Sequence, residues 1–270
     1  MAIDDDAWPG PEAGSYLTAL SDLDRARLYP YRAPDGGYLL SAGQLYPLRQ
    51  ADIDRQADSL FAGRVPVLSV GSNRAPVQLL RKFGDQAVVP VTPARLHDCD
   101  IVHTAYLGYY AAVPCTAFPA KGVVAHLNVA WLDQDQLQQM HRTEGIGVAY
   151  DFVEMQGVEH QFTVPQGPVF GYAARFGVLD CGDGAPAGLA AIPVRGRVFQ
   201  TLDQQAAATL VRRLGGGDDA RSLDRFLRDM QADKPARDAL VDRLRHYAIH
   251  PVTPPWRVVP VTADDIDDYL

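Results

Sequence analysis

Two features of this chain carry polar groups suited to proton exchange or anion binding: a Gly-Ser-Asn turn at residues 71–73 and the carboxyl group of Glu144. The turn follows the aliphatic run VPVLSV and precedes Pro76, which predicts a strand that turns sharply into a helix. Backbone N–H groups at the start of such a helix lack intrahelical partners and attract anions. The turn is therefore a candidate site for a carboxylate or an oxyanion.

Glu144 lies at the end of a predicted helix, in the stretch WLDQDQLQQMHRTEG. Asp133 has the spacing to its following residues that is typical of a capping box, so we expect the helix to begin there. Glu144 follows Leu137 by seven residues and Met140 by four, which places it on the apolar stripe. Burial and the negative end of the helix dipole before Gly145 both favour the protonated carboxyl. Enzymes tune a glutamate in this direction when it exchanges protons near neutral pH.

The composition limits the class of protein and its partners. With 270 residues, 47% hydrophobic and 21% charged, the chain is typical of a globular protein. No stretch approaches the roughly 18 to 20 apolar residues of a membrane span, and the acidic start MAIDDDAWPGPEAG predicts a cytoplasmic protein. A net charge of -8 without a dense basic block argues against nucleic acid as a partner. The three cysteines share no CxxC spacing, which argues against a disulfide framework or a zinc site.

Three parts with different patterns follow one another along the chain: residues 1–63, 64–180 and 181–270. The first is an extension that ends in an amphipathic segment, ADIDRQADSLFAG. The second contains short runs rich in Val, Tyr and Phe, which predict the strands of a barrel or strongly bent sheet. Helical patterns interrupt these runs near residues 76–83 and 133–144. The third part has repeated helical patterns, and we expect it to pack on the barrel.

The middle part resembles the γ-glutamylcyclotransferase-like family over residues 65–178. The resemblance consists of the strand before Gly-Ser-Asn, the run Pro-Ala-Arg-Leu, and GVVAHLNVAWLDQDQLQQMHRTEG with a tyrosine shortly after. Members of that family typically have Tyr-Gly-Ser-Asn at the end of the first strand and a Glu-Gly pair at the end of a short helix. The fold expected is α+β: a small mixed or antiparallel β-barrel with flanking helices, an N-terminal extension and a C-terminal helical region.

The resemblance implies an intramolecular reaction, of lyase or transferase type, on a small γ-glutamyl amine or peptide. The α-amine attacks its own γ-carbonyl, so that an amine leaves and 5-oxoproline remains. Glu144 would be the catalytic acid and base, and neither a metal nor an organic cofactor is expected. The predicted substrate-binding residues are Val70, Gly71, Ser72, Asn73, Arg74 and Tyr150. The identity of the amine and the oligomeric state stay open.

Val70 departs from the family pattern, which has a tyrosine at this position. The loss of that hydroxyl favours an alternative in which the chain is a non-catalytic member of the fold that binds an amino-acid-like ligand or a partner chain. A second alternative keeps the catalysis and changes the substrate, for instance to a γ-glutamyl protecting group removed during biosynthesis. The long extensions on both sides of the matching region favour a specialised role.

Other interpretations compete for the individual residues. Glu144 is also placed to form a structural ion pair with an arginine such as Arg142 or Arg95. His141 and Glu144 have the i, i+3 spacing of some metal ligands, but a metal site needs three or four ligands and no second pair occurs nearby. Ser72 lacks the Gly-x-Ser-x-Gly elbow of a serine nucleophile.

Overall fold

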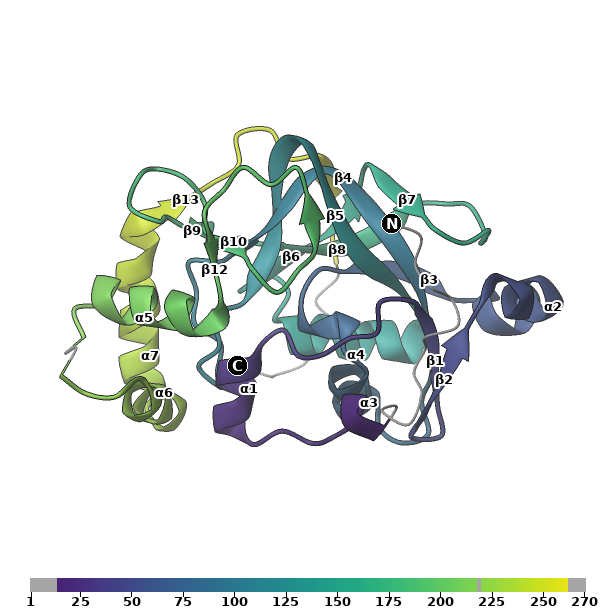
Figure 1. Ribbon diagram of the computed structural model, residues 1–270, viewed down its shortest axis with the longest axis horizontal. Helices are drawn as coiled ribbons and strands as arrows, with labels where there is room; N and C mark the ends of the chain where they lie inside the picture. Colours follow the sequence, from purple (N-terminus) through teal and green to yellow (C-terminus); the bar gives the residue numbers. More distant parts are fainter. Residues whose placement is uncertain (1–13, 218–219, 262–270) are drawn as a thin grey trace.

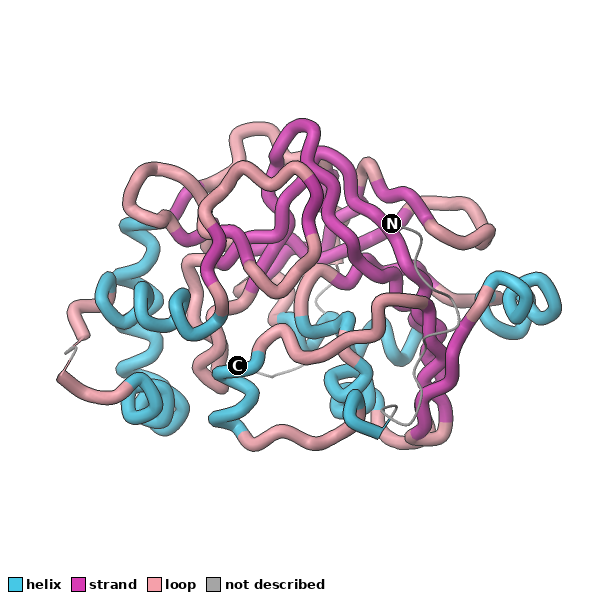
Figure 2. The backbone as a smooth tube through the Cα atoms, viewed as in Figure 1, coloured by secondary structure: helices cyan, strands magenta, loops and turns pink. Residues whose placement is uncertain are grey.

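Two long antiparallel strands, β4 (Val88–His103) and β5 (Cys115–Leu132), form the centre of the structure. The computed structural model describes residues 14–217 and 220–261. The last six residues of β5, Leu127–Leu132, are all buried, so both faces of the sheet are covered here. Helices lie below the strands and at both ends of the sheet in Figures 1 and 2, which makes the protein α+β as expected.

The main sheet is mixed, with the strand order β12-β10-β4-β5-β3-β8-β6-β14. The strands beside the central hairpin are β3 (Val65–Ser69), β8 (Val169–Ala174), β6 (Tyr150–Met155), β14 (Trp256–Val258), β10 (Gly188–Leu189) and β12 (Thr201–Leu202). β3 pairs antiparallel with β5 and parallel with β8, which places the end of β3 inside the sheet. The residues after β3 therefore begin at a buried position.

The closed barrel that the sequence predicted is wrong for the described residues. The path of strands ends at β12 on one side and β14 on the other, and these two strands do not pair with each other in the described ranges. Both are short, with two and three residues, and form the ends of an open sheet. The pattern of apolar runs predicts strands but not their partners, and closure depends on the partners.

Strands from all three expected parts of the chain join this sheet. β1 (Gly37–Ser41) pairs with β2 (Gln44–Leu48) and with β4, and β11 (Val194–Arg195) pairs with β5. The remaining strands are β7 (Val158–His160) on β4, and the separate pair β9 (Val178–Leu179) and β13 (Ala248–Ile249). The boundaries at residues 63 and 180 stay predictions, whereas the sheet itself extends across both.

Helices α3 (Pro76–Phe83) and α4 (Gln134–Glu144) lie side by side below the sheet in Figure 1. α4 begins as predicted, because Asp133 accepts a hydrogen bond from the backbone N–H of Gln136. It ends at Gly145, which adopts the left-handed conformation (φ 60°) that glycine tolerates best. These two caps fix Glu144 in the last turn.

The other helices flank the ends of the sheet. They are α1 (Asp22–Leu28), α2 (Gln50–Phe61), α5 (Gln204–Leu214), α6 (Leu223–Ala232) and α7 (Lys234–Leu244), with short 3-10 turns η2 (Ser72–Arg74) and η3 (Arg245–Tyr247). α1 packs with the three C-terminal helices through buried side chains that include Ala26, Val211, Leu227 and Leu240. None of the helices in the described ranges has both the length and the hydropathy of a membrane-spanning segment.

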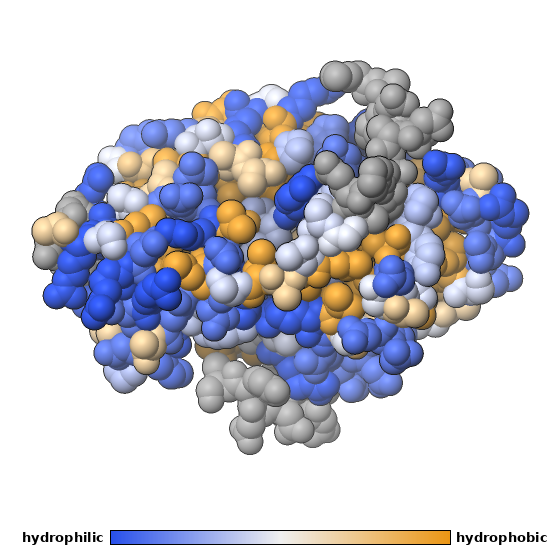
Figure 3. All heavy atoms as spheres, turned by 60° about the horizontal axis from the view of Figure 1, so that its bottom comes forward, coloured by the Kyte–Doolittle hydropathy of each residue, from blue (hydrophilic) through white to orange (hydrophobic). Residues whose placement is uncertain are grey.

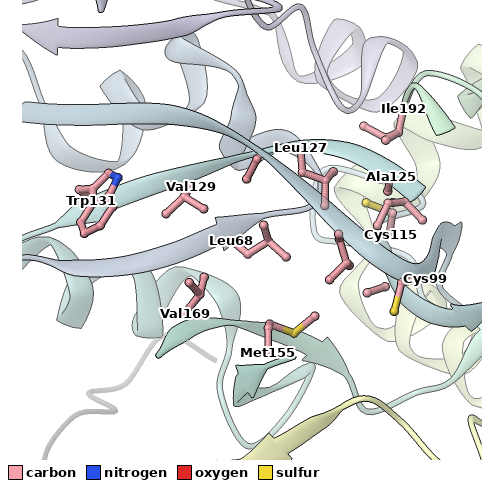
Figure 4. Close-up of a cluster of buried hydrophobic side chains, with 14 of the residues drawn as sticks. Leu68, Cys99, Cys115, Ala125, Leu127, Val129, Trp131, Met155, Val169 and Ile192 are labelled. Atoms are coloured by element: carbon pink, nitrogen blue, oxygen red, sulfur yellow. The ribbon is translucent and has the colours of Figure 1, made fainter. Parts of the chain in front are cut away.

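The largest hydrophobic cluster fills the space between the strands. Leu68 from β3, Val129 from β5, Met155 from β6 and Val169 from β8 face one another in Figure 4. Cys115, at the start of β5, belongs to the same cluster and also lies against Gly71, the first residue of the Gly-Ser-Asn turn. The hydrophobic core thus extends directly to the candidate site.

Candidate functional site

The Gly-Ser-Asn turn connects β3 to α3, as the sequence predicted. Val70 follows the strand, Gly71 precedes the turn η2, and Pro76 is the first residue of α3. A Cβ atom on Gly71 would lie 2.3 Å from the Tyr29 hydroxyl and 2.8 Å from the Cys115 sulfur. Such contacts are far shorter than van der Waals distance, so position 71 requires glycine because of close packing.

The turn and Glu144 lie together, although they are far apart in sequence. The Asn73 amide Nδ2 donates a hydrogen bond of 3.0 Å to Glu144 Oε1, and Lys82 Nζ lies 2.5 Å from the same oxygen. α3 carries Lys82 and α4 carries Glu144, so the contact between these two helices brings the pair together. The carboxylate is therefore held by one neutral donor and one cation.

Lys82 is the residue that the sequence analysis missed most clearly. Its side chain is only 2% exposed and that of Glu144 is 16% exposed. Burial lowers the pKa of Lys82, and the Glu144 carboxylate opposes part of this shift. Lys82 follows the buried Leu79 by three residues, so its place on the inner stripe of α3 was readable from the spacing.

The expected arginine partners of Glu144 have other contacts. Arg142 Nε donates to the side chain of Gln139 at 3.1 Å, and Arg95 forms its ion pair with Glu159 at 3.4 Å. A structural ion pair of Glu144 does exist, but its cation is Lys82. Glu144 Oε1 therefore accepts from both Lys82 and Asn73.

A small cavity joins the turn to the carboxyl group. Its lining includes Val70, Gly71, Ser72, Asn73, Glu144 and Tyr150. The cavity has a volume of about 30 Å³, which is comparable to the space of one water molecule in the liquid. This volume is smaller than that of a γ-glutamyl group.

Three tyrosines line the cavity: Tyr29, Tyr150 and Tyr172. Burial raises the pKa of all three hydroxyls well above the ordinary value, so they are neutral hydrogen-bonding groups near pH 7. Tyr150 donates to the backbone oxygen of Cys115 at 3.3 Å, and the Tyr172 hydroxyl lies 2.9 Å from His141 Nδ1. The cavity is thus lined by phenolic hydroxyls around one carboxylate.

Tyr29 brings a hydroxyl beside Gly71, although position 70 is valine. The backbone N–H of Cys115 donates to the Tyr29 hydroxyl at 3.2 Å, and the Cys115 sulfur lies 3.2 Å from the same oxygen. Tyr29 comes from the N-terminal part of the chain, and no local pattern in the sequence links it to the turn. A tyrosine hydroxyl therefore lies beside the turn, and it comes from a residue that sequence reasoning missed.

Cys115 also lines the cavity, as a neutral thiol. Burial raises its pKa to about 12, so the thiolate that a cysteine nucleophile needs is absent near neutral pH. His141 is engaged with Tyr172, and no three His, Cys, Asp or Glu side chains of the described residues come together as a metal site. The chemistry of the cavity is therefore that of Glu144 and its donors.

Arg74 is the predicted site residue that does not line the cavity. Its Nε donates to Asn128 Oδ1 at 2.9 Å, and its backbone oxygen accepts from the Tyr38 hydroxyl at 2.7 Å. Burial lowers the pKa of Arg74, whose residue is 9% exposed. The side chain is thus directed into the protein on the other side of the turn.

Comparison with known proteins adds two solved structures. No protein-family model matches the chain, and no curated protein matches its sequence. A structure described as gamma-glutamyl cyclotransferase aligns with a TM-score of 0.37 and 11% identity, over 66% of this chain and 99% of that chain. A human structure, described as an ensemble refinement of uncharacterized protein loc79017, aligns with a TM-score of 0.34 and 12% identity, over 75% of this chain and 96% of that one.

Proposed function

We propose that the protein cyclises a γ-glutamyl amine or peptide to 5-oxoproline and the free amine, with Glu144 as general base and acid. The observation that carries this proposal is the meeting of the Gly71–Asn73 turn with the Glu144 carboxyl around one cavity. The carboxylate is a proton acceptor, and the N–H groups of Ser72 and Asn73 have no partner within the turn, so a base and hydrogen-bond donors line the same cavity. These are the two requirements of an intramolecular acyl transfer.

Glu144 is suited to both proton transfers of this reaction. Its carboxylate takes a proton from the substrate α-ammonium, and the resulting amine attacks the γ-carbonyl carbon. When the tetrahedral intermediate collapses, Glu144 returns the proton to the leaving nitrogen and the bond from the γ-carbonyl carbon to this nitrogen breaks. The ring nitrogen gives its second proton, through the freed carboxylate, to the departing amine, so that 5-oxoproline and an ammonium remain. Lys82 Nζ and Asn73 Nδ2 both contact Oε1 and so fix the orientation of the carboxylate.

The turn is suited to stabilising the oxyanion of the intermediate. η2 begins at Ser72, so the N–H groups of its first residues lack partners within the helix. Fixed donors of this kind are worth most where water is excluded, as in a buried cavity.

A product assay tests the proposal directly. The purified protein is incubated with a panel of γ-glutamyl amino acids and amines, and 5-oxoproline is measured by mass spectrometry. Glu144→Gln keeps the shape and removes the base, so turnover should fall by about two to four orders of magnitude. Glu159→Gln is the matched control, because Glu159 is exposed on β7 and pairs with Arg95 and His97. Absence of product from the whole panel contradicts the proposal.

The second candidate function is binding without turnover. The observation that favours it is the ion pair of Glu144 with Lys82, which already occupies the carboxylate. In that case a γ-glutamyl compound binds, releases no 5-oxoproline, and binds to Glu144→Gln with unchanged affinity. Calorimetry with the panel that is used for the product assay separates the two functions.

A further inference from the structure

A second and much larger space lies next to the small cavity. It is a groove of about 590 Å³, and Tyr29 and Gly71 line both spaces. The groove is formed by residues 15–20 and 28–35 of the N-terminal part, together with Arg74 and Val77 beyond the turn. Its volume is typical of a pocket that binds a small organic molecule.

The walls of the groove are mainly aromatic and apolar. Tyr16, Tyr29 and Tyr31 contribute rings, and Leu20, Leu28 and Val77 contribute aliphatic side chains. Leu28 is 53% exposed, although it is a large hydrophobic residue. The N-terminal part runs along the bottom of Figure 1 and comes forward in Figure 3, where hydrophobic residues cross the middle of a hydrophilic surface.

The charges of the groove do not favour an ionic ligand. Arg32 and Asp35 are exposed, so solvent screens their charges. Arg74 is buried, its Nε donates to Asn128, and its charge interacts with that of Asp35. The groove is therefore best suited to an uncharged, apolar group.

We propose that this groove binds the leaving group of the substrate and selects an amine or short peptide with an aromatic or branched apolar side chain. The inference rests on the proposed function, because it is the cyclisation at Glu144 that divides the substrate into two parts. The small cavity is smaller than the substrate, and the groove is the space that adjoins it at Tyr29 and Gly71. Tyr29 forms the boundary, so its displacement joins the two spaces.

A comparison of two substrates tests the selection. Wild-type protein is assayed with γ-glutamylphenylalanine and with γ-glutamylalanine, which differ only in the phenyl ring of the leaving group. Burial of this ring in the groove should raise kcat/KM for the first compound by about tenfold or more. Equal kcat/KM values for the two compounds overturn the inference and leave the cyclisation intact.

Variants of the groove locate the effect. The double variant Leu28→Ser/Val77→Ser removes two aliphatic side chains from the walls, and the preference for the phenyl compound should fall towards one. Val252→Ser is the matched control, because Val252 is 98% exposed and does not line the groove. A preference that survives the double variant places the ring elsewhere and also overturns the inference.

Binding separates this inference from the proposed function. Glu144→Gln is titrated with both compounds by calorimetry, so that no turnover is needed. Tighter binding of the phenyl compound by about tenfold, lost in the additional presence of Leu28→Ser/Val77→Ser, supports the groove even if the wild-type protein releases no 5-oxoproline. Absence of 5-oxoproline counts against the proposed function alone, whereas equal affinities count against the groove alone.

Discussion

The Asn73 amide and the Glu144 carboxylate are joined by a hydrogen bond of 3.0 Å across 71 residues of sequence. This bond connects the turn after β3 to the last turn of α4. These are the two places where the sequence predicts site residues. Glu144 precedes the left-handed Gly145 and Asn73 lies in the turn before Pro76, so the fold sets their relative position. Because of this bond, a substitution of Asn73 should change the environment of the Glu144 carboxylate directly.

Asn73→Asp should move the acidic limb of the pH–rate profile to higher pH. The substitution places a second carboxylate about 3 Å from Glu144, and two like charges at this distance favour retention of a proton. The base is then available only at higher pH, so activity at pH 7 falls and recovers partly at alkaline pH. Asn73→Ala removes the hydrogen bond without adding charge and is the matched control, for which the limb should move less. If Asn73→Asp and Asn73→Ala have the same pH–rate profile, residue 73 does not lie beside the catalytic base in solution.

Lys82→Met should destabilise the fold by about 3 kcal/mol, because it leaves a largely buried carboxylate without its cation. In the Glu144→Gln background the same substitution should cost much less, since no charge is left unpaired. Urea unfolding of the four proteins gives the coupling free energy. If the free-energy changes of Lys82→Met and Glu144→Gln simply add in the double variant, the 2.5 Å contact between these two side chains contributes nothing to stability in solution.

Gly71→Ala should destabilise the protein by about 1 to 3 kcal/mol through overpacking against Tyr29 and Cys115. Tyr29→Phe removes the closest atom, the hydroxyl at 2.3 Å, and leaves the ring carbon at 3.3 Å. Gly71→Ala should therefore cost less in the Tyr29→Phe background, although the Cys115 sulfur still opposes it. Thermal unfolding of the double-mutant cycle measures the difference. If Gly71→Ala lowers the stability equally in the wild type and in the Tyr29→Phe background, the Tyr29 hydroxyl does not contact the turn in solution.

Local signals account for what the sequence predicted well. The limits of α4 and the turn after β3 follow from Asp133, Gly145 and Pro76, whose effects extend over only a few residues. The position of Tyr29 could not be predicted, because it depends on the path of the chain before β1. The open sheet has the same origin, since strand partners are set by tertiary packing and leave little trace in local periodicity.

Cys115 should make the protein sensitive to alkaline pH. Burial raises the pKa of this thiol from its ordinary 9.0 to about 12 in the folded state. Between these values the unfolded chain releases a proton that the folded chain keeps, so stability is full below pH 9 and declines as the pH rises. The decline from this thiol is at most about 1.4 kcal/mol per pH unit.

Urea unfolding at pH 8, 9, 10 and 11 measures this contribution. The free energy of unfolding should decline less steeply with pH for Cys115→Ser than for the wild type. Cys181→Ser is the control, because Cys181 is less buried. Equal slopes for Cys115→Ser and the wild type would mean that the thiol ionises alike in the folded and unfolded chains.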